Sequence, residues 1–261
     1  MKIYIITDME GISGIRQMEQ VKRDQPAAYQ PARRLLCGDV NAAIAGAFEG
    51  GASEVVVNDG HGGGFNFLIE EMDPRAVYER PNGGLQMMPA LDETFTAVFC
   101  VGYHAMAGTL NGFLDHTQSS MSWFEYRVNG RPTGELGQLG LVAGHYGVPV
   151  TLVTGDQAAC DEGRAFFGEI ETAAVKQGIG RQHARCLHPQ RAHELIRTAA
   201  ARAVSLSKTI KPYATDLPAT VQLTYYRSDM ADAAARRPGT RRVDARTLER
   251  VVDDARLILG F

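Results

Sequence analysis

Three short apolar runs along this chain each end in polar side chains of the kind that bind metals. The runs span residues 3–7, 55–57 and 98–103, and the polar residues that follow them are Asp8, Glu10, Asp59, His61 and His104. Continuous apolar runs of this length are typical of buried strands in a parallel sheet. Because the crevice of an open parallel sheet lies beyond the carboxyl ends of its strands, we expect these side chains to converge at one edge.

The first two runs are joined by a segment that predicts a crossover helix. A strand is expected over residues 2–7, and alanine-rich residues 32–49 are typical of a helix that ends at Gly50 and Gly51. The strand expected over residues 54–58 follows at once. Such a strand-helix-strand unit favours parallel pairing with a right-handed crossover.

The middle of the chain continues to alternate strands and helices. The expected elements are a short helix near residues 67–72, a strand over 97–103, a hairpin over 123–133 that turns at Asn129-Gly130, a helix over 136–146, a strand over 149–154 and a helix through residues 160 and 167. Asn-Gly between aromatic and β-branched residues is a strong signal for a two-residue hairpin turn. Asp156 suits the N-cap of the last of these helices.

Candidate chemistry becomes sparse beyond residue 170. A long helix is expected over residues 189–207, a strand over 221–226 and a final amphipathic helix over 247–259. We therefore predict an α/β fold with a mostly parallel central sheet flanked by helices and a smaller C-terminal α+β lobe. Residues 1–170 would form the metal-binding catalytic domain and residues 171–261 the supporting lobe, unless the two form one continuous domain.

The composition of the chain indicates which kinds of molecule it can bind. The chain has 261 residues and a net charge of −3, so it offers no broad basic surface for nucleic acid or anionic membranes, and a small substrate is expected. The N-terminus lacks the long apolar region of a signal peptide, and no stretch approaches the roughly 18 to 20 apolar residues of a membrane span, which predicts a soluble cytoplasmic protein. The four cysteines form no C-x-x-C pair.

Five residues make up a candidate metal site: Asp8, Glu10, His61, His104 and Glu135. Three carboxylates and two imidazoles without a thiolate suit zinc, manganese or iron better than magnesium, and they favour an open catalytic site over a closed structural one. Five ligands exceed what one tetrahedral zinc ion needs. A pair of metals about 3.5 to 4 Å apart, bridged by a carboxylate, is therefore expected, with Asp8 as the bridge.

Each of these residues taken alone also has a purely structural explanation. Asp8 and Glu10 could solvate a loop, although positions i and i+2 of an extended segment point the same way. His61 could be a surface histidine in a glycine-rich turn, and those glycines could instead cradle a phosphate, although no Gly-Lys-Ser/Thr follows. His104 could be hydrogen-bonded at a strand end, and Glu135 could simply open a helix.

His116 is the remaining reactive candidate. Imidazole can take or give a proton near neutral pH, which suits an acid or base beside an activated water, and the alternative is an ordinary loop histidine. A serine nucleophile has less support because the chain contains no G-x-S-x-G elbow. Ser13 is expected at most to line the pocket. Tyr103, Met121, Trp123 and Phe124 are candidates for either the specificity pocket or the core.

Five motifs in this order resemble the DppA family of zinc-dependent D-aminopeptidases, peptidase family M55. They are Asp8-Met-Glu10-Gly-Ile-Ser-Gly, Asn58-Asp-Gly-His61, Gly102-Tyr-His104-Ala, Asp115-His116 and Gly134-Glu135-Leu-Gly. The similarity extends from residue 1 to about residue 188 and continues more weakly to the C-terminus.

The resemblance implies a site for two zinc ions in which Asp8 bridges and Glu10, His61, His104 and Glu135 complete the coordination. It also implies that His116 is the active-site residue and that the chain forms a ring-like homodecamer. The chain departs from the family in the three glycines after His61 and in the residues beside His116, which are Asp115 and Thr117 rather than serines. Either departure could reshape the substrate pocket.

The leading hypothesis is a zinc-dependent aminopeptidase that cleaves short peptides or amino-acid amides, including those with an N-terminal D-residue. A water activated by two zinc ions would attack, and His116 would assist proton transfer. Two alternatives remain open at this stage. One is a metallohydrolase of a phosphoester or another small amide, and the other is a peptide-binding protein without catalysis.

Overall fold

The computed structural model describes residues 1–81, 87–259 and 261, and most of its described strands form a seven-stranded sheet. In spatial order these strands are β3 (Val77–Glu79), β2 (Glu54–Asp59), β1 (Lys2–Thr7), β4 (Ala97–Tyr103), β7 (Val150–Asp156), β8 (Glu171–Gly180) and β9 (His183–Cys186). All neighbouring strands pair in parallel except β8 and β9, which are antiparallel. The predicted α/β class with a mostly parallel central sheet is confirmed.

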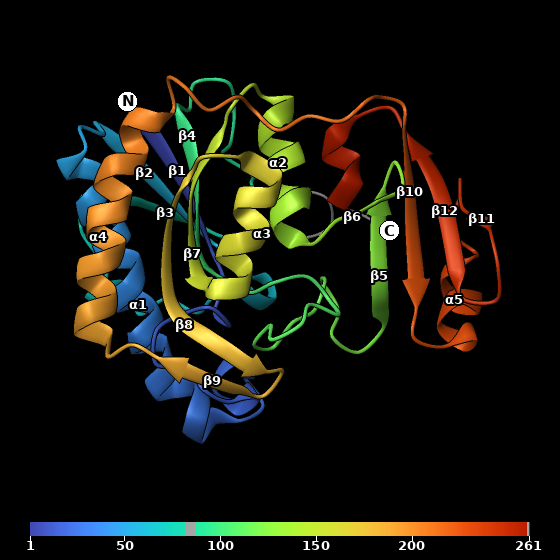
Figure 1. Ribbon diagram of the computed structural model, residues 1–261, viewed down its shortest axis with the longest axis horizontal. Coiled ribbons are helices and arrows are strands. Elements are labelled where there is room, and N and C mark those ends of the chain that lie inside the picture. Colours follow the sequence, from blue (N-terminus) through green and yellow to red (C-terminus); the bar gives the residue numbers. More distant parts are fainter. Residues whose placement is uncertain (82–86, 260) are drawn as a thin grey trace.

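Helices cover both faces of this sheet (Figure 1). The α-helices are α1 (Pro26–Glu49), α2 (Glu135–His145), α3 (Gln157–Phe167), α4 (Pro189–Leu206) and α5 (Ser228–Ala234), and the 3-10 helices are η1 (Met18–Val21), η2 (His61–Gly63), η3 (Ile69–Glu71) and η4 (Ala255–Leu259). Helices α1 and α4 pack on one face of the sheet, and α2 and α3 on the other. No described helix combines the length and the apolar composition that crossing a membrane requires.

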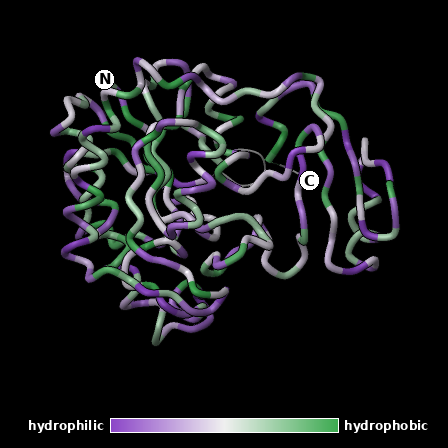
Figure 2. Tube along the Cα trace, in the orientation of Figure 1, coloured by the Kyte–Doolittle hydropathy of each residue, from purple (hydrophilic) through white to green (hydrophobic). Residues whose placement is uncertain are grey.

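The alternation of side chains along β1 shows why its sequence is apolar throughout. Ile3 and Ile5 belong to the core under α1 and α4, whereas Tyr4 and Ile6 belong to the core under α2 and α3. Successive side chains of a strand point to opposite faces, so a strand covered on both sides has no polar face. Figure 2 shows the resulting hydrophobic colour along the central strands.

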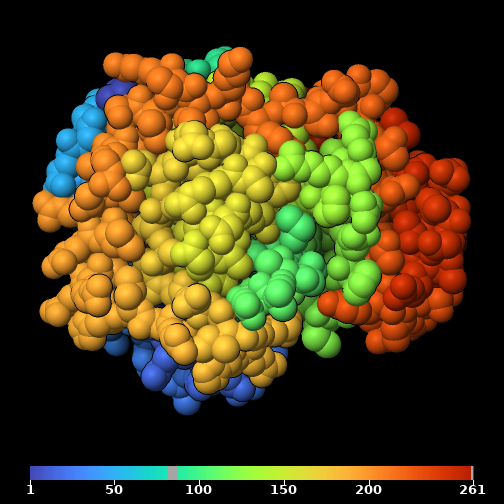
Figure 3. All heavy atoms as spheres, in the orientation of Figure 1, coloured from blue at the N-terminus to red at the C-terminus, as the bar shows by residue number. Residues whose placement is uncertain are grey.

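A second, antiparallel sheet lies beside the first. Its strands in spatial order are β11 (Arg241–Arg242), β12 (Thr247–Val252), β10 (Ala219–Tyr225), β5 (Trp123–Val128) and β6 (Arg131–Pro132). The predicted hairpin between β5 and β6 is confirmed, since Asn129 has φ 47° and Gly130 has φ 79°, the positive values that a two-residue turn of this type needs. In Figure 3 the C-terminal strands, in red, cover one end of the molecule beside the green β5 region.

One predicted element near the C-terminus is wrong, and one predicted N-cap is confirmed in its position but not in its hydrogen bonding. Residues 247–259 form β12 and η4 rather than one helix, because β12 gains backbone partners on both sides from β10 and β11. Asp156 stands at the N-cap of α3, but its carboxylate accepts hydrogen bonds from the backbone N–H groups of Phe113 and Gly178 instead of from the helix.

The predicted division at residue 170 stays a prediction. The hairpin β5–β6 of the second sheet precedes this position, and β8 and β9, which follow it, belong to the first sheet.

The order of strands fixes where a site can form. From β1 the chain crosses through α1 to β2 on one side, and it later returns to β4 on the other side of β1. This reversal opens a crevice beyond the carboxyl ends of β1 and β4. The residues that follow these two strands therefore lie next to each other.

Candidate metal centre

Asp8 and His104 meet at the crevice, as their positions directly after β1 and β4 predict. The distance between Asp8 Oδ2 and His104 Nε2 is 3.2 Å. Both residues are buried, with relative exposures of 6% and 2%. A carboxylate or an imidazole is stable in so buried a position only if partners compensate for its loss of hydration.

The loop after β2 brings His61 to the other side of Asp8. His61 Nδ1 lies 2.9 Å from Asp8 Oδ1 and 3.2 Å from Glu10 Oε2. Asp8 thus has one imidazole against each of its two oxygens. Asp59 supports the loop, because its carboxylate accepts hydrogen bonds from the backbone N–H and the side-chain amide of Asn66.

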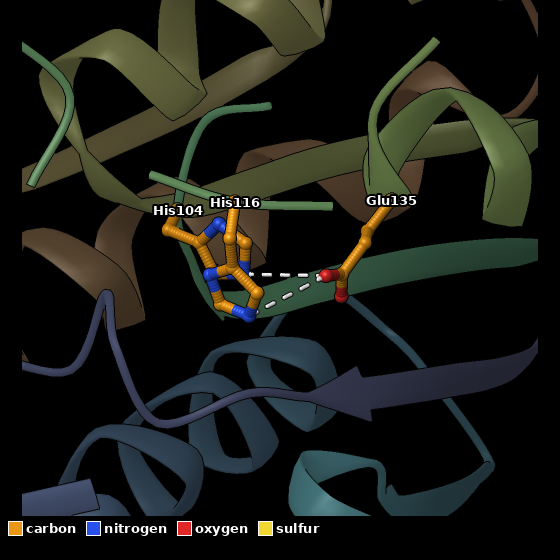
Figure 4. A group of neighbouring side chains, drawn as sticks. All are labelled: His104, His116 and Glu135. Atoms are coloured by element: carbon orange, nitrogen blue, oxygen red, sulfur yellow. Dashed lines mark ion pairs between the residues drawn. The ribbon is translucent and has the colours of Figure 1, made fainter. Parts of the chain in front are cut away.

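Glu135, the first residue of α2, completes the cluster (Figure 4). Its Oε1 lies 3.5 Å from His104 Nε2 and 3.7 Å from His116 Nε2. The rings of His104 and His116 stack with centroids 3.9 Å apart and planes 13° apart. The backbone N–H of Gln118 donates to Glu135 Oε1 over 2.7 Å, which fixes the carboxylate toward the two imidazoles.

Backbone carbonyls orient all three histidines. Each ring uses one nitrogen to contact a carbonyl oxygen: His61 Nε2 with Val21 at 2.9 Å, His104 Nδ1 with Ala105 at 2.9 Å, and His116 Nδ1 with Leu114 at 2.8 Å. A carbonyl can only accept, so these nitrogens carry the proton. In the neutral imidazole the opposite nitrogen then presents its lone pair to the carboxylate cluster, which is the state that a metal ligand requires.

The electrostatics of the cluster favour cations. Burial alone lowers the pKa of His61, but the carboxylates of Glu10 and Asp8 outweigh it and raise that pKa well above its usual value. Burial likewise acts to raise the pKa of Glu135, yet the charge and hydrogen bonding of His104 bring it down to about 2. The carboxylates therefore remain ionised, and their negative charge is concentrated in a buried space.

Two buried atoms without hydrogen-bond partners provide a test of whether metal ions fit here. Glu10 Oε2 and His104 Nε2 are both buried, and although each lies 3.2 Å from another group of the cluster, neither makes a hydrogen bond of suitable geometry among the described residues. Ligand atoms of Asp8, Glu10 and His104 lie within 4.8 Å of one another, as do those of His104, His116 and Glu135. The oxygen and imidazole atoms of Asp8, Glu10, His104 and Glu135 therefore suit divalent metal ions, and His116 lies beside them.

A cavity of about 440 Å³ opens in front of this cluster. Tyr103 lines it, whereas Met121, Trp123 and Phe124 are not among its described lining residues. The expectation that Ser13 lines the pocket is wrong, because Ser13 is fully buried and hydrogen-bonds to Asp39 through its hydroxyl and its backbone N–H.

Several residues around the cluster were not singled out in the sequence. Lys176 of β8 is buried, and its Nζ donates to the carbonyl oxygens of Glu10 and Ile15 over 2.6 Å and 2.8 Å, which ties down the loop that carries Asp8 and Glu10. The sequence signal that could have identified Lys176 is the presence of a lysine within an apolar strand. Gln118 and Arg80, which also line the cavity, stand in loops without a distinguishing pattern.

Comparisons with known proteins agree on one family. Residues 1–260 match the model of the M55 peptidase family, which is described as D-aminopeptidase. A D-aminopeptidase of Bacillus subtilis (strain 168) is 35% identical over 244 residues, which cover 92% of this chain and 87% of that protein. The solved structure of the zinc-dependent D-aminopeptidase DppA from Bacillus subtilis, described as a self-compartmentalizing protease, superposes with a TM-score of 0.95 at 32% identity and covers 99% of this chain and 94% of that one.

Proposed function

This chain belongs to peptidase family M55, the D-aminopeptidases, and on that basis we propose that it removes the N-terminal residue from short peptides or amino-acid amides that begin with a D-amino acid. As a member of this family the protein is a hydrolase, and its solved relative is zinc-dependent. The single observation that best supports the proposal is the convergence of Asp8, Glu10, His61, His104 and Glu135 at one end of the sheet.

We assign these five side chains to two zinc ions. Asp8 would bridge, because each of its oxygens faces a different histidine. Glu10 with His61 and Glu135 with His104 would complete the two sides. When bound, the ions would polarise the scissile carbonyl and lower the pKa of a water molecule.

His116 supplies the proton transfer in this proposal. Its Nδ1 is held by the carbonyl of Leu114, so Nε2 carries the lone pair, and the residue lines the cavity. Nε2 can therefore accept the proton of the attacking water and return it to the amine that leaves. Gln118 contributes by orienting Glu135 through its backbone N–H.

We also propose that the chain acts as a homo-oligomer, with a ring of ten copies as the specific form. The relative with the solved structure is described as self-compartmentalizing, which supports assembly into an enclosed particle. Enclosure would restrict the sites to short peptides. We further propose that the protein works in the cytoplasm.

Hydrolysis of matched D- and L-alanyl amides by the zinc-loaded protein tests the main proposal. We expect turnover of the D-form with about two zinc ions per chain, and loss of turnover on chelation that zinc reverses. Turnover of the L-form alone would overturn the stereochemical assignment. A protein with bound zinc that cleaves neither amide would overturn the aminopeptidase assignment.

Two variants separate metal binding from proton transfer. Glu135→Ala should lose both zinc and activity, because it removes a carboxylate that faces two imidazoles. His116→Ala should keep its zinc but lose about 10²- to 10⁴-fold in kcat, the usual contribution of a positioned acid or base. His183→Ala, at an exposed position of β9, is the control and should leave both measurements unchanged.

A further inference from the structure

The charges that line the active-site cavity are divided between two groups. Asp8, His61, His116 and Glu135 belong to the metal centre, whereas Arg80 is the one arginine or lysine among the described lining residues. A small cavity with a metal-binding acidic cluster and a separate guanidinium is complementary to a molecule that carries opposite charges at its two ends.

The guanidinium of Arg80 is held in place by neighbouring groups. Its central carbon lies 4.4 Å from the centroid of the Phe65 ring, and Nη1 donates to the carbonyl of Pro81 over 3.2 Å. Its aliphatic stem packs against Gly64, where an added Cβ would lie 2.5 Å from Arg80 Cβ. Stacking on a ring leaves the in-plane N–H donors of a guanidinium able to bind a ligand.

The backbone at Phe65 is arranged to present this ring. Phe65 has φ 70°, a conformation that residues other than glycine rarely adopt, and its side chain is 67% exposed. An exposed phenylalanine in a costly conformation has no packing explanation of its own. Its contact with Arg80 gives it one, because the ring fixes a cationic side chain that borders the cavity.

The carboxylate of the neighbouring residue Glu79 does not pair with the Arg80 guanidinium. Glu79 Oε1 accepts a hydrogen bond from the hydroxyl of Tyr4 and another from the backbone N–H of Ala90, so this oxygen is committed to the body of the protein.

We propose that Arg80 is a specificity residue that binds the terminal carboxylate of short peptide substrates, so that the enzyme prefers dipeptides with a free C-terminus over their amides. This inference rests on the proposed aminopeptidase function. The planar guanidinium matches a carboxylate with two parallel N–H···O bonds. The peptide would place its amine and scissile bond at the metal centre and its carboxylate at Arg80.

The test compares two probes that share one scissile bond, D-alanyl-D-alanine and D-alanyl-D-alanine amide. In the zinc-loaded Arg80→Met variant we expect kcat/KM for the dipeptide to fall about 10- to 100-fold, mainly through KM, as expected for loss of a charge-assisted bidentate contact. The value for the amide should stay within about twofold, since it makes no such contact. Arg80→Lys should restore part of the loss for the dipeptide.

Arg75→Met is the matched control. Arg75 also stacks on a phenylalanine, with 4.5 Å between its central carbon and the Phe48 centroid, but it does not line the cavity. This variant should leave the ratio of the two kcat/KM values unchanged.

Two results would overturn the inference and can be told apart. An unchanged ratio in Arg80→Met, or an equal loss for both probes with normal zinc content, would reject the role of Arg80 while the aminopeptidase function stands. Absence of turnover of both probes by the zinc-loaded wild-type protein would reject the proposed function and the inference with it.

Discussion

One further carboxylate, Glu162 of α3, lies buried next to the segments that carry the metal centre. Its Oε2 accepts a hydrogen bond from the backbone N–H of Met106 over 2.7 Å, and its Oε1 is buried without a partner among the described residues. The same oxygen packs against Gly134, where an added Cβ would lie 2.4 Å away. Burial raises the pKa of Glu162 to about 7.

The raised pKa predicts a pH-dependent loss of stability in the metal-free protein. The unfolded chain releases this proton near pH 4.5, whereas the folded chain keeps it up to about pH 7. The unfolded state therefore binds fewer protons between these values, and the free energy of unfolding falls by up to about 1.4 kcal/mol per pH unit as the pH rises.

Glu162→Gln removes this dependence. We expect urea unfolding of the metal-free proteins to show similar stability at pH 4.5 and greater stability of the variant at pH 8. An unchanged difference between variant and wild type across this range would show that Glu162 ionises normally.

At the scale of single residues, the sequence identified those side chains that follow apolar strands. Asp8 and His104 were recognisable because a polar group directly after a buried run has few structural roles. The residues that the sequence did not identify act through backbone atoms: Gln118 orients Glu135 with its N–H, and Lys176 binds two carbonyls. A buried lysine in an apolar strand is a visible signal, but its partners, like the contact of the Gln118 N–H, depend on how distant segments approach one another.

At the scale of elements, the loops after β1 and β4 approach backbone to backbone. The N–H of Gly11 donates to the carbonyl of Gly102 over 2.7 Å. A Cβ on Gly11 would lie 2.1 Å from the carbonyl oxygen of Tyr103. This contact sets the spacing between Glu10 and His104.

Gly11→Ala should force these two loops apart. We expect less than full zinc content, at least about a 10-fold lower kcat/KM, and a loss of about 1–3 kcal/mol in unfolding free energy, as for other overpacked sites. Gly180→Ala is the matched control, because no atom lies within 4 Å of its added Cβ. Zinc content and activity equal to those of the wild type in Gly11→Ala would contradict this view of the contact.

Element types followed from the sequence where an uninterrupted apolar run marked a buried strand, as in β1 and β4. The prediction failed for residues 247–252, where Thr247, Leu248 and Val252 are buried as parts of a strand between β10 and β11. In this segment, pairing with other strands of the second sheet determined the secondary structure. Long-range pairing also explains why β8 and β9 were not predicted, since β8 is a strand because it pairs with β7.

At the scale of the whole molecule, the proposed assembly predicts a particle far larger than one chain. Light scattering on the zinc-loaded protein should give a mass about ten times the 28.4 kDa of the chain, as expected for a closed cyclic or dihedral ring arrangement. The measurement should be repeated over a range of protein concentrations. A constant mass of one or two chains would contradict the proposed assembly.

The pairing of β5 with β10 has a consequence for synthesis of the chain on the ribosome. Glu135 follows directly after the β5–β6 hairpin, and β5 pairs with β10 (Ala219–Tyr225) in the second sheet. A nascent chain that has emerged only to the end of α4 already contains all five candidate ligands, but the hairpin before Glu135 still lacks this partner. Because non-local strand pairing waits for the later strand, we expect the fifth ligand to be fixed last, so that incomplete chains do not yet hydrolyse peptides.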